Sequence, residues 1–182
     1  SIVVPTFNEE ANIPTLYGRL TEVLTALATR YEIVMVDDGS DDGTPDVAAR
    51  FADRAISSAR GRAIQMNAGA RAACGEILVF LHIDTSLPPD ALTLIRGALQ
   101  EDARVWGRFD VRIEGVHPLL PAVAAFMNAR SRTTGIATGD QAVFVRRSAF
   151  ERVGGYPEIA LMEDIALSAS LKRLSRPACL RA

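Results

Sequence analysis

The sequence predicts a single α/β domain built on a mixed, mainly parallel sheet with helices on both faces. Through the first hundred residues, short β-branched runs alternate with segments whose apolar residues recur at helical spacing, which is typical of parallel strands joined by helices. The 182 residues suit one hydrophobic core, and 48% hydrophobic with 23% charged residues is a globular composition. Residues 1–182 are therefore expected to form one domain.

The individual elements follow from the same periodicities. The β-branched runs predict strands at residues 2–4, 33–36, 55–57, 77–81 and 142–145. Apolar spacing predicts helices at residues 13–27, from 44 onward, 63–74, 88–99, 119–128 and 163–174, with Thr44 as an N-cap before Pro45. Alternation from Val105 to Ile113 predicts an antiparallel strand with one wetter face. The second half is thus expected to extend the sheet with antiparallel strands.

Composition also narrows the class of function. A net charge of −2 gives no general attraction to nucleic acid, so no nucleic-acid partner is expected. Cys74 and Cys179 have no CxxC spacing, which disfavours a zinc site or a disulfide scaffold and suits the cytoplasm. No stretch reaches the ~20 apolar residues of a transmembrane helix. The apolar helix at 119–128 is interpreted as core packing, with peripheral contact at the inner membrane as the alternative.

Acidic residues stand at the ends of two predicted parallel strands. Asp37 and Asp38 follow the second strand, and Asp84 follows the strand that ends at Leu81. The carboxyl ends of parallel strands meet in one crevice, where several carboxylates would repel one another unless a cation lay between them. A shared divalent cation is therefore the favoured hypothesis for these three residues. Helix capping is the alternative, and it is preferred for Asp41 and Asp42.

The common phosphate-binding loops are missing from this sequence. No GxGxxG follows the first strand and no GxxxxGK[ST] occurs, so neither a Rossmann dinucleotide loop nor a P-loop is expected. A phosphate would then be held by a metal ion, by arginines and by helix N-termini. Arg62, which follows Gly61 at the start of a predicted helix, is the candidate arginine. A surface arginine beside a turn glycine is an equally good interpretation of that pair taken alone.

Several blocks of the sequence, taken together, resemble the family 2 glycosyltransferases. The blocks Val3–Glu10, Val34–Thr44, Asn67–Gly69 and His82–Asp84 occur in the family's order, and Val153–Tyr156 followed by Glu163-Asp164 resembles its acceptor-side pattern. The similarity runs from Ser1 to about Leu174. Within the family, the Gly61–Gly69 block and the Thr138–Gln141 block resemble a soluble bacterial branch of uncertain substrate.

The resemblance implies a GT-A fold and an inverting, hexosyltransferase-type glycosyltransferase. A nucleotide-sugar-binding half at about 1–100 and an acceptor-binding half at about 101–182 are implied, with a UDP- or GDP-sugar as donor. The implied acceptor is a lipid-linked or small molecule. The donor-binding residues carried over are Pro5, Thr6, Asn8, Glu9, Asp37, Asp38, Gly39, Arg62, Asn67, Gly69, His82 and Asp84. The acceptor-binding candidates are Gly139, Asp140 and Gln141. No oligomeric state follows from the sequence.

The resemblance also assigns the chemistry. Asp84 matches the last residue of the family's DxD motif, which binds Mn²⁺ or Mg²⁺ on the donor diphosphate. A bound divalent ion stabilises the charge that develops on a departing diphosphate. Asp164 matches the base that removes the acceptor's proton, a contribution of roughly 10²–10⁴-fold, and Glu163 is expected to orient it. His82 replaces the first Asp of DxD, so it is a candidate second metal ligand and leaves the metal's identity open.

Two alternatives to a glycosyltransferase remain at this point. A sugar-1-phosphate nucleotidyltransferase on a similar fold would carry a glycine- and arginine-rich loop after the first strand, where this chain has Thr6–Glu9. A degenerate, non-catalytic nucleotide-sugar-binding protein would agree with His82 but not with the retained Glu163-Asp164 pair. Release of pyrophosphate from a sugar-1-phosphate and a nucleoside triphosphate would identify the nucleotidyltransferase, whereas release of nucleoside diphosphate from a sugar nucleotide would identify a transferase.

Overall fold

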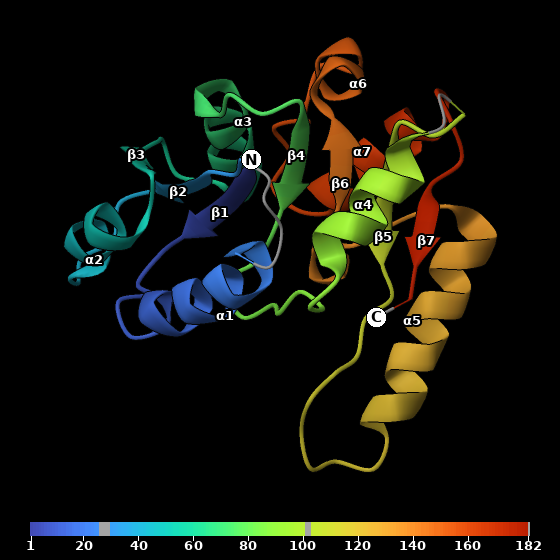
Figure 1. The fold of residues 1–182 in the computed structure, drawn as a ribbon, viewed down its shortest axis with the longest axis horizontal. Helices are drawn as coiled ribbons and strands as arrows, with labels where there is room; N and C mark the ends of the chain where they lie inside the picture. The colour runs from blue at the N-terminus through green and yellow to red at the C-terminus, as the bar shows by residue number, and fades with distance from the viewer. Residues whose placement is uncertain (26–29, 101–102, 182) are drawn as a thin grey trace.

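The computed structural model describes residues 1–25, 30–100 and 103–181, which form one seven-stranded sheet flanked by helices (Figure 1). The strand order is β3-β2-β1-β4-β6-β5-β7. In the first half, β1 pairs in parallel with β2 and β4, and β3 pairs in parallel with β2. These strands are β1 (Ile2–Thr6), β2 (Ile33–Asp37), β3 (Arg54–Ser57) and β4 (Ile77–Phe80). The predicted parallel half is confirmed.

The second half extends the sheet beyond β4. β6 (Phe144–Arg146) pairs antiparallel with β4, and β5 (Trp106–Phe109) pairs antiparallel with β6. β7 (Ala178–Leu180) then pairs in parallel with β5 at the edge. The antiparallel extension is therefore confirmed, and the parallel edge strand is an addition to it.

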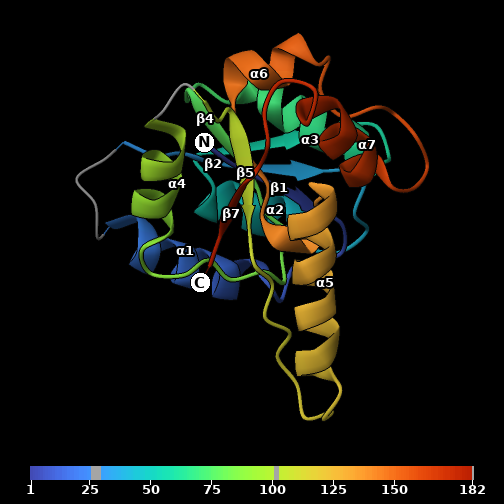
Figure 2. The same ribbon diagram turned by 90° about the vertical axis from the view of Figure 1, so that its right-hand side faces the viewer.

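Helices cover both faces of the sheet (Figure 2), so the hydrophobic core has two parts, one on each face of the sheet. One face carries α1 (Ile13–Thr25), α2 (Thr44–Phe51) and α4 (Ala91–Gln100). The other carries α3 (Arg62–Ala72), α6 (Arg147–Arg152) and α7 (Glu163–Leu171). Each helix on these faces turns buried side chains toward the sheet, so packing on both sides fixes the strand ends where a site can form.

Helix α3 lies unusually close to the sheet at Gly69. A Cβ on Gly69 would lie 2.3 Å from Val3 Cγ1, so any larger residue would force α3 away from β1. One turn earlier, Gln65 donates from Nε2 to the carbonyl oxygens of Thr6 and Val36, each at 2.9 Å. These contacts hold the start of α3 against the carboxyl ends of β1 and β2. Gly69 has a packing role in this position.

Two local predictions are wrong. β5 ends at Phe109 and all four of its residues are buried, because Trp106 enters one core and Phe109 the other. The expected alternation through Ile113 is therefore not realised as a strand with one wetter face. α2 begins at Thr44 itself, and the Thr44 hydroxyl accepts a hydrogen bond from the Glu9 backbone N–H at 2.7 Å instead of capping the helix. The last two residues of the helix predicted at 13–27 lie outside the described ranges.

Helix α5 (Leu120–Thr134) also differs from the prediction of core packing. Only Ala124 and Ser131 of this helix are buried, whereas the side chains of Val123 and Phe126 are exposed. α5 and the connection before it project away from the rest of the molecule (Figure 2). The apolar surface of the helix therefore faces outward along most of its length. No helix among the described residues has the length and apolar character needed to cross a bilayer.

Candidate active site

The candidate site lies where the carboxyl ends of β1, β2 and β4 meet, the edge at which open α/β sheets bind ligands. Loops β1–α1 and β2–α2 are tied together there. Asn8, whose φ is +55°, donates from its backbone N–H to Ser40 Oγ at 2.9 Å and accepts from the Asp41 N–H at 3.0 Å. Glu9 accepts from Asn12 Nδ2 at 2.5 Å. Pro5 and Thr6 form the end of β1 beneath these loops.

The Asp37 side chain stabilises the turn that follows β2. Its Oδ2 accepts the backbone N–H groups of Gly39 and Ser40 at 3.0 and 3.1 Å, and its Oδ1 accepts the Ser40 hydroxyl. Gly39 has φ +102°, a conformation that suits glycine. The carboxylate is buried and engaged with its own loop, so its contribution to the site is to shape the loop that follows β2.

Asp38 points toward the start of α3. Its Oδ2 accepts the Gly61 N–H at 2.9 Å, where Gly61 adopts φ +133°. Its Oδ1 is buried and has no hydrogen-bond partner among the residues described. Such an oxygen costs free energy until a donor reaches it. Asp38 is thus the carboxylate at this edge with an oxygen left for a ligand's N–H or O–H group.

An aromatic and an arginine beside Asp38 were not among the predicted site residues. Phe7 is 40% exposed, and the Arg60 guanidinium lies 4.7 Å from its ring centre. A planar ring and a cation at the mouth of a nucleotide pocket suit stacking and phosphate contacts. The signal was present in the block Val3–Glu10, where Phe7 stands between two predicted site residues. Arg60 carries no motif signal because its position depends on the turn before Gly61.

Asp37, Asp38 and Asp84 make different contacts in the structure, and a cation shared by all three stays a prediction. Within residues 1–25, 30–100 and 103–181, no three His, Cys, Asp or Glu side chains gather to hold a metal ion. Asp37 accepts hydrogen bonds from backbone N–H groups of its own turn, and Asp38 accepts one from Gly61. Asp84 is exposed and has only a weak contact, at 3.4 Å, from the Thr85 hydroxyl. Of the three carboxylates, that of Asp84 is the one exposed to solvent.

His82 lies between the end of β4 and the predicted acceptor segment. Its Nδ1 lies 3.5 Å from Asp140 Oδ1, and its Nε2 is buried without a partner in the described structure. A Cβ placed on Gly139 would lie 2.4 Å from that Nε2, so the absent side chain of Gly139 makes room for the ring. A hydrogen bond from His82 is the main cause that lowers the pKa of Asp140 below its ordinary value. His82 thus joins the end of β4 to the predicted acceptor segment.

That acceptor segment is the short 3₁₀ turn η1 (Gly139–Gln141). Thr138 and Gln141 form a reciprocal capping box, and Gln141 also donates from Nε2 to Asn128 Oδ1 at 3.4 Å. Gln141 is buried, so its amide stabilises the turn. Asp140 projects outward with a side chain that is 58% exposed. Of the three predicted acceptor residues, Asp140 is the one whose functional group reaches solvent.

The Glu163-Asp164 pair begins helix α7 and lies next to this turn. Both side chains are buried, and Asp164 Oδ1 has no partner within the described structure. Burial first, and then the negative charge of Glu163, raises the pKa of Asp164 above its ordinary value. Arg62 Nη1 lies 3.8 Å from Glu163 Oε1. A buried carboxylate with a raised pKa and a free oxygen is suited to accept a proton.

Asn67 is the predicted donor-binding residue whose side chain is most clearly occupied. Its Nδ2 donates to the Tyr156 carbonyl oxygen at 2.8 Å, and its Oδ1 accepts the Tyr156 N–H at 2.9 Å. Both ends of the amide are therefore used inside the protein. The structure brings Asn67 to the loop before α7 rather than to the open edge of the sheet.

A groove of about 930 Å³ leads from the site toward α5. Asp84 and Asp140 stand on its wall, and Asn128 of α5 lines it further along. A second cavity of about 380 Å³ lies between Arg62 and Glu163, under the loop that precedes α7. Asp140 lines the groove, and Glu163, the neighbour of Asp164 in the sequence, lines the second cavity.

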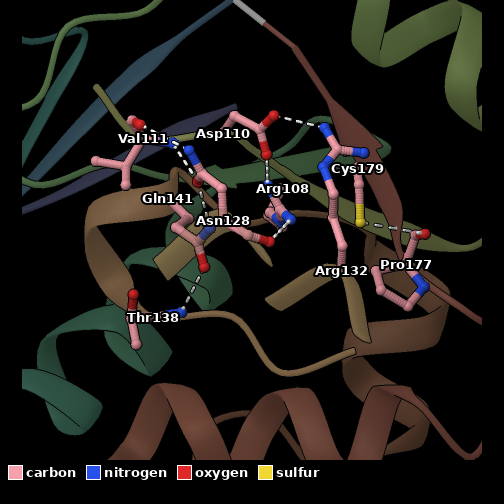
Figure 3. A network of polar contacts seen from close by, with 9 residues as sticks. All are labelled: Arg108, Asp110, Val111, Asn128, Arg132, Thr138, Gln141, Pro177 and Cys179. Carbon is pink, nitrogen blue, oxygen red and sulfur yellow. Dashed lines mark hydrogen bonds and ion pairs between the residues drawn. The ribbon is translucent and has the colours of Figure 1, made fainter. Parts of the chain in front are cut away.

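A buried ion network holds the base of α5 against the sheet (Figure 3). Arg108 is fully buried and pairs with Asp110, which Arg132 of α5 also contacts. Asn128 exchanges two hydrogen bonds with the Val111 backbone, at 2.8 and 2.9 Å, and its carbonyl accepts from Arg108 Nη2 at 3.3 Å. This network fixes the far wall of the groove.

Comparison with known proteins identifies the family. The model of the family described as "Glycosyl transferase family 2" matches residues 1–154. Undecaprenyl-phosphate 4-deoxy-4-formamido-L-arabinose transferase from Aeromonas hydrophila is 32% identical over 109 residues, covering 55% of this chain and 33% of the relative. The protein of the same name from Pseudomonas syringae is 29% identical over 168 residues, covering 80% of this chain and 46% of the relative. The chain therefore spans less than half the length of these curated relatives.

Solved structures share the fold at low sequence identity. A mannosyltransferase from Pyrobaculum calidifontis, in complex with GDP-Man and Mn²⁺, has a TM-score of 0.72 at 22% identity over 100% of this chain and 53% of its own. Glucosyl-3-phosphoglycerate synthase from Mycobacterium tuberculosis, with Mn²⁺, UDP and phosphoglyceric acid, has a TM-score of 0.71 at 19% identity over 99% and 67%. The fold is thus of the GT-A type, and the chain belongs to glycosyl transferase family 2.

Proposed function

We propose that this chain is the catalytic part of a glycosyltransferase that moves a sugar from a nucleoside diphosphate sugar to an acceptor hydroxyl. The proposal depends above all on Asp164, a buried carboxylate with a raised pKa and an unpartnered oxygen, next to the predicted acceptor segment at Gly139. In that position it would take the acceptor's proton as the hydroxyl attacks the anomeric carbon. A single in-line displacement inverts the configuration at that carbon.

The remaining residues divide between donor and acceptor. The free oxygen of Asp38 would accept from the nucleoside, and the Phe7 ring with Arg60 above it would flank the base. Arg62 and the N-terminus of α3 face the second cavity and would contact the diphosphate. Asp140 would contact a hydroxyl group from the groove side. The two cavities together would then hold donor and acceptor.

A divalent cation would fit this arrangement through Asp84. Asp84 offers an exposed oxygen ligand on the groove wall, whereas His82 and Asp37 are engaged elsewhere. Mg²⁺ is commonly held by one or two carboxylates together with substrate phosphates, and Mn²⁺ also favours oxygen ligands. When bound, the cation would neutralise charge on the departing diphosphate. The structural neighbours that carry Mn²⁺ agree with this proposal.

The direct test is a panel of UDP- and GDP-sugars, measured with and without Mn²⁺ by thermal shift and by release of nucleoside diphosphate. We expect at least one donor to raise the melting temperature only with metal, because ligand binding to the native state stabilises it. Asp84→Asn should abolish the metal-dependent part of that shift, and Asp90→Asn, on the exposed surface nearby, should retain it. Pyrophosphate release from a sugar-1-phosphate and a nucleoside triphosphate would instead identify a nucleotidyltransferase.

The acceptor is proposed to be lipid-linked. The curated relatives are named for undecaprenyl phosphate, and the exposed apolar side chains Leu119, Val123 and Phe126 lie on the projecting part of the molecule. Contact with a bilayer would bring such an acceptor to the groove. We expect flotation of the chain with phosphatidylglycerol-containing vesicles, reduced by Phe126→Ser. If the chain floated with neither anionic nor neutral vesicles, the lipid-linked acceptor would be excluded in favour of a small-molecule acceptor in the cytoplasm.

A further inference from the structure

The edge of the sheet that holds the candidate site continues past β4. β5 runs antiparallel to β6, which itself runs antiparallel to β4, so β4 and β5 end at the same edge of the sheet. β7 is parallel to β5, and its Leu180 carbonyl oxygen accepts the Asp110 N–H at 2.7 Å. The residues that follow β5 and β7 therefore lie beside one another, on the edge that also carries Asp84.

Two arginines stand on this part of the edge and line the groove. Arg112 comes three residues after the end of β5, and Arg181 directly follows β7. Both are exposed, and both line the groove of about 930 Å³ whose wall also includes Asp84. Neither arginine forms an ion pair with any residue that the structure describes. Their guanidinium groups are therefore available to a ligand in the groove.

The charge at this end of the groove is positive. Both oxygens of Asp110 are already contacted by the two arginines of the network in Figure 3. Glu114 is the other carboxylate there, and it is exposed on the groove wall. Together with Arg112 and Arg181, these arginines outnumber the two carboxylates. An anion bound at this end would thus meet a net positive charge.

The spacing of the strands separates this end from the donor diphosphate. β5 is the second strand from β4 and β7 the third, so at ~4.8 Å per strand their ends lie about 10 and 14 Å from the end of β4. A diphosphate that shares a cation with Asp84 must stay close to it, because Mg²⁺ holds its ligands at about 2.0–2.1 Å. The arginine pair is therefore better placed for a second anion than for the donor.

From this arrangement we infer that Arg112 and Arg181 bind a phosphate group of the acceptor. The inference rests on the proposed function, in which the acceptor occupies the groove and Asp140 contacts its hydroxyl group. Guanidinium groups match the geometry of phosphate oxygens and can bind them in pairs. The acceptor is then an alcohol that carries a phosphate group, held at the far end of the groove from the donor.

The same groove also offers apolar contacts. Val111, Ile113 and Met127 line it beside the arginine pair. The phosphate can therefore belong to a lipid headgroup, whose chains would meet these side chains, or to a soluble phosphomonoester. Both sources share the chemistry that the arginines recognise.

The test compares probes that differ in the phosphate group. Glycerol 3-phosphate and short-chain dihexanoylphosphatidylglycerol carry it, whereas glycerol and dihexanoylglycerol do not. The side-chain Nε–H NMR signals of Arg112 and Arg181, assigned with the single Arg→Gln variants, should shift with the two phosphate probes only. Tighter binding of the lipid probe would identify a lipid headgroup, and equal affinity for the two would identify a soluble phosphomonoester.

The double variant Arg112→Gln with Arg181→Gln should weaken binding of the phosphate probes roughly tenfold or more, because it removes two charge-assisted contacts. Affinity for UDP and GDP with Mn²⁺ should stay at the wild-type value. Arg50→Gln makes the same chemical change on the exposed last turn of α2 and should leave binding of every probe unchanged.

Arginine signals that do not shift with either phosphate probe would overturn the inference. So would a double variant that loses as much affinity for UDP or GDP as for the probes, since the two arginines would then belong to the donor site. Failure of the proposed function is seen separately, as the absence of nucleoside diphosphate release from every donor of the panel, whatever the arginine signals show.

Discussion

Asp164→Asn is expected to reduce sugar transfer by roughly 10²–10⁴-fold, the usual contribution of a positioned general base. The amide keeps the shape of the side chain but cannot accept a proton from the acceptor hydroxyl. Donor binding should stay near wild type, because Asp164 lies beyond the nucleotide-binding edge and beside the turn at Gly139. Transfer and donor affinity are measured separately, by nucleoside diphosphate release and by calorimetry with the nucleoside diphosphate.

The pH dependence of the wild-type enzyme should also report the protonation of Asp164. Because burial raises the pKa of Asp164, the carboxylate is present above that raised pKa and is lost as the pH falls through it. The acidic limb of kcat/KM should therefore lie above the pH at which an ordinary aspartate titrates. Asp46→Asn, on the exposed first turn of α2, is the matched control and should change neither rate nor profile. Transfer by Asp164→Asn within a few-fold of wild type would exclude this residue as the base.

Asp110→Ala is expected to lower the free energy of unfolding by about 3–5 kcal/mol, because it leaves a buried arginine without its partner. Arg108 has no exposed surface, and Asp110 is its carboxylate partner in the network of Figure 3. The loss should appear in urea unfolding as a lower midpoint with a similar slope. The groove wall formed by Asp110 and Asn128 should loosen in the same variant.

A comparison within the network tests the buried pair specifically. Arg132 contacts the same carboxylate but its side chain is 33% exposed, so Arg132→Met should cost no more than about 1 kcal/mol. The double variant Arg108→Met with Asp110→Leu should recover much of the lost stability, since apolar replacement removes both charges together. Equal losses of unfolding free energy in Asp110→Ala and Arg132→Met would show that the burial of Arg108 does not make its ion pair more important for stability.

The fold and the location of the site could be read from the sequence because both depend on local patterns. Alternating β-branched and amphipathic segments specify the parallel half, and acidic residues after β2 and β4 mark the edge where the site forms. The orientation of the individual carboxylates could not be read in this way. Asp37 turns inward because Gly39 adopts a positive φ that presents two backbone N–H groups to it. The sequence alone does not predict this backbone geometry, so it does not distinguish the role of Asp37 from that of Asp38.

Contacts between residues far apart in the sequence could not be predicted either. Asn67 lies in a block typical of donor-binding residues, yet its amide is occupied by Tyr156 from the other half of the chain. His82 stands at a position typical of a metal ligand, and its contacts with Asp140 and Gly139, more than 50 residues away, could not be predicted. For α5, the apolar composition suggested core packing, whereas the helix leaves the body of the protein and exposes those side chains. In each case the decisive contact joins segments far apart in the sequence.

The link between α3 and the loop before α7 has a consequence for exchanging segments among relatives. A chimera that takes its N-terminal half from one transferase and its C-terminal half from another would inherit Asn67 from the first parent and Gly155-Tyr156 from the second. A Cβ on Gly155 would lie 2.6 Å from Asn67 Oδ1, so this glycine belongs with the other two residues. Unless both parents carry compatible residues at these positions, the hybrid would lose the two hydrogen bonds that join Asn67 to the Tyr156 backbone. Recombination should therefore treat these three positions as one inherited unit.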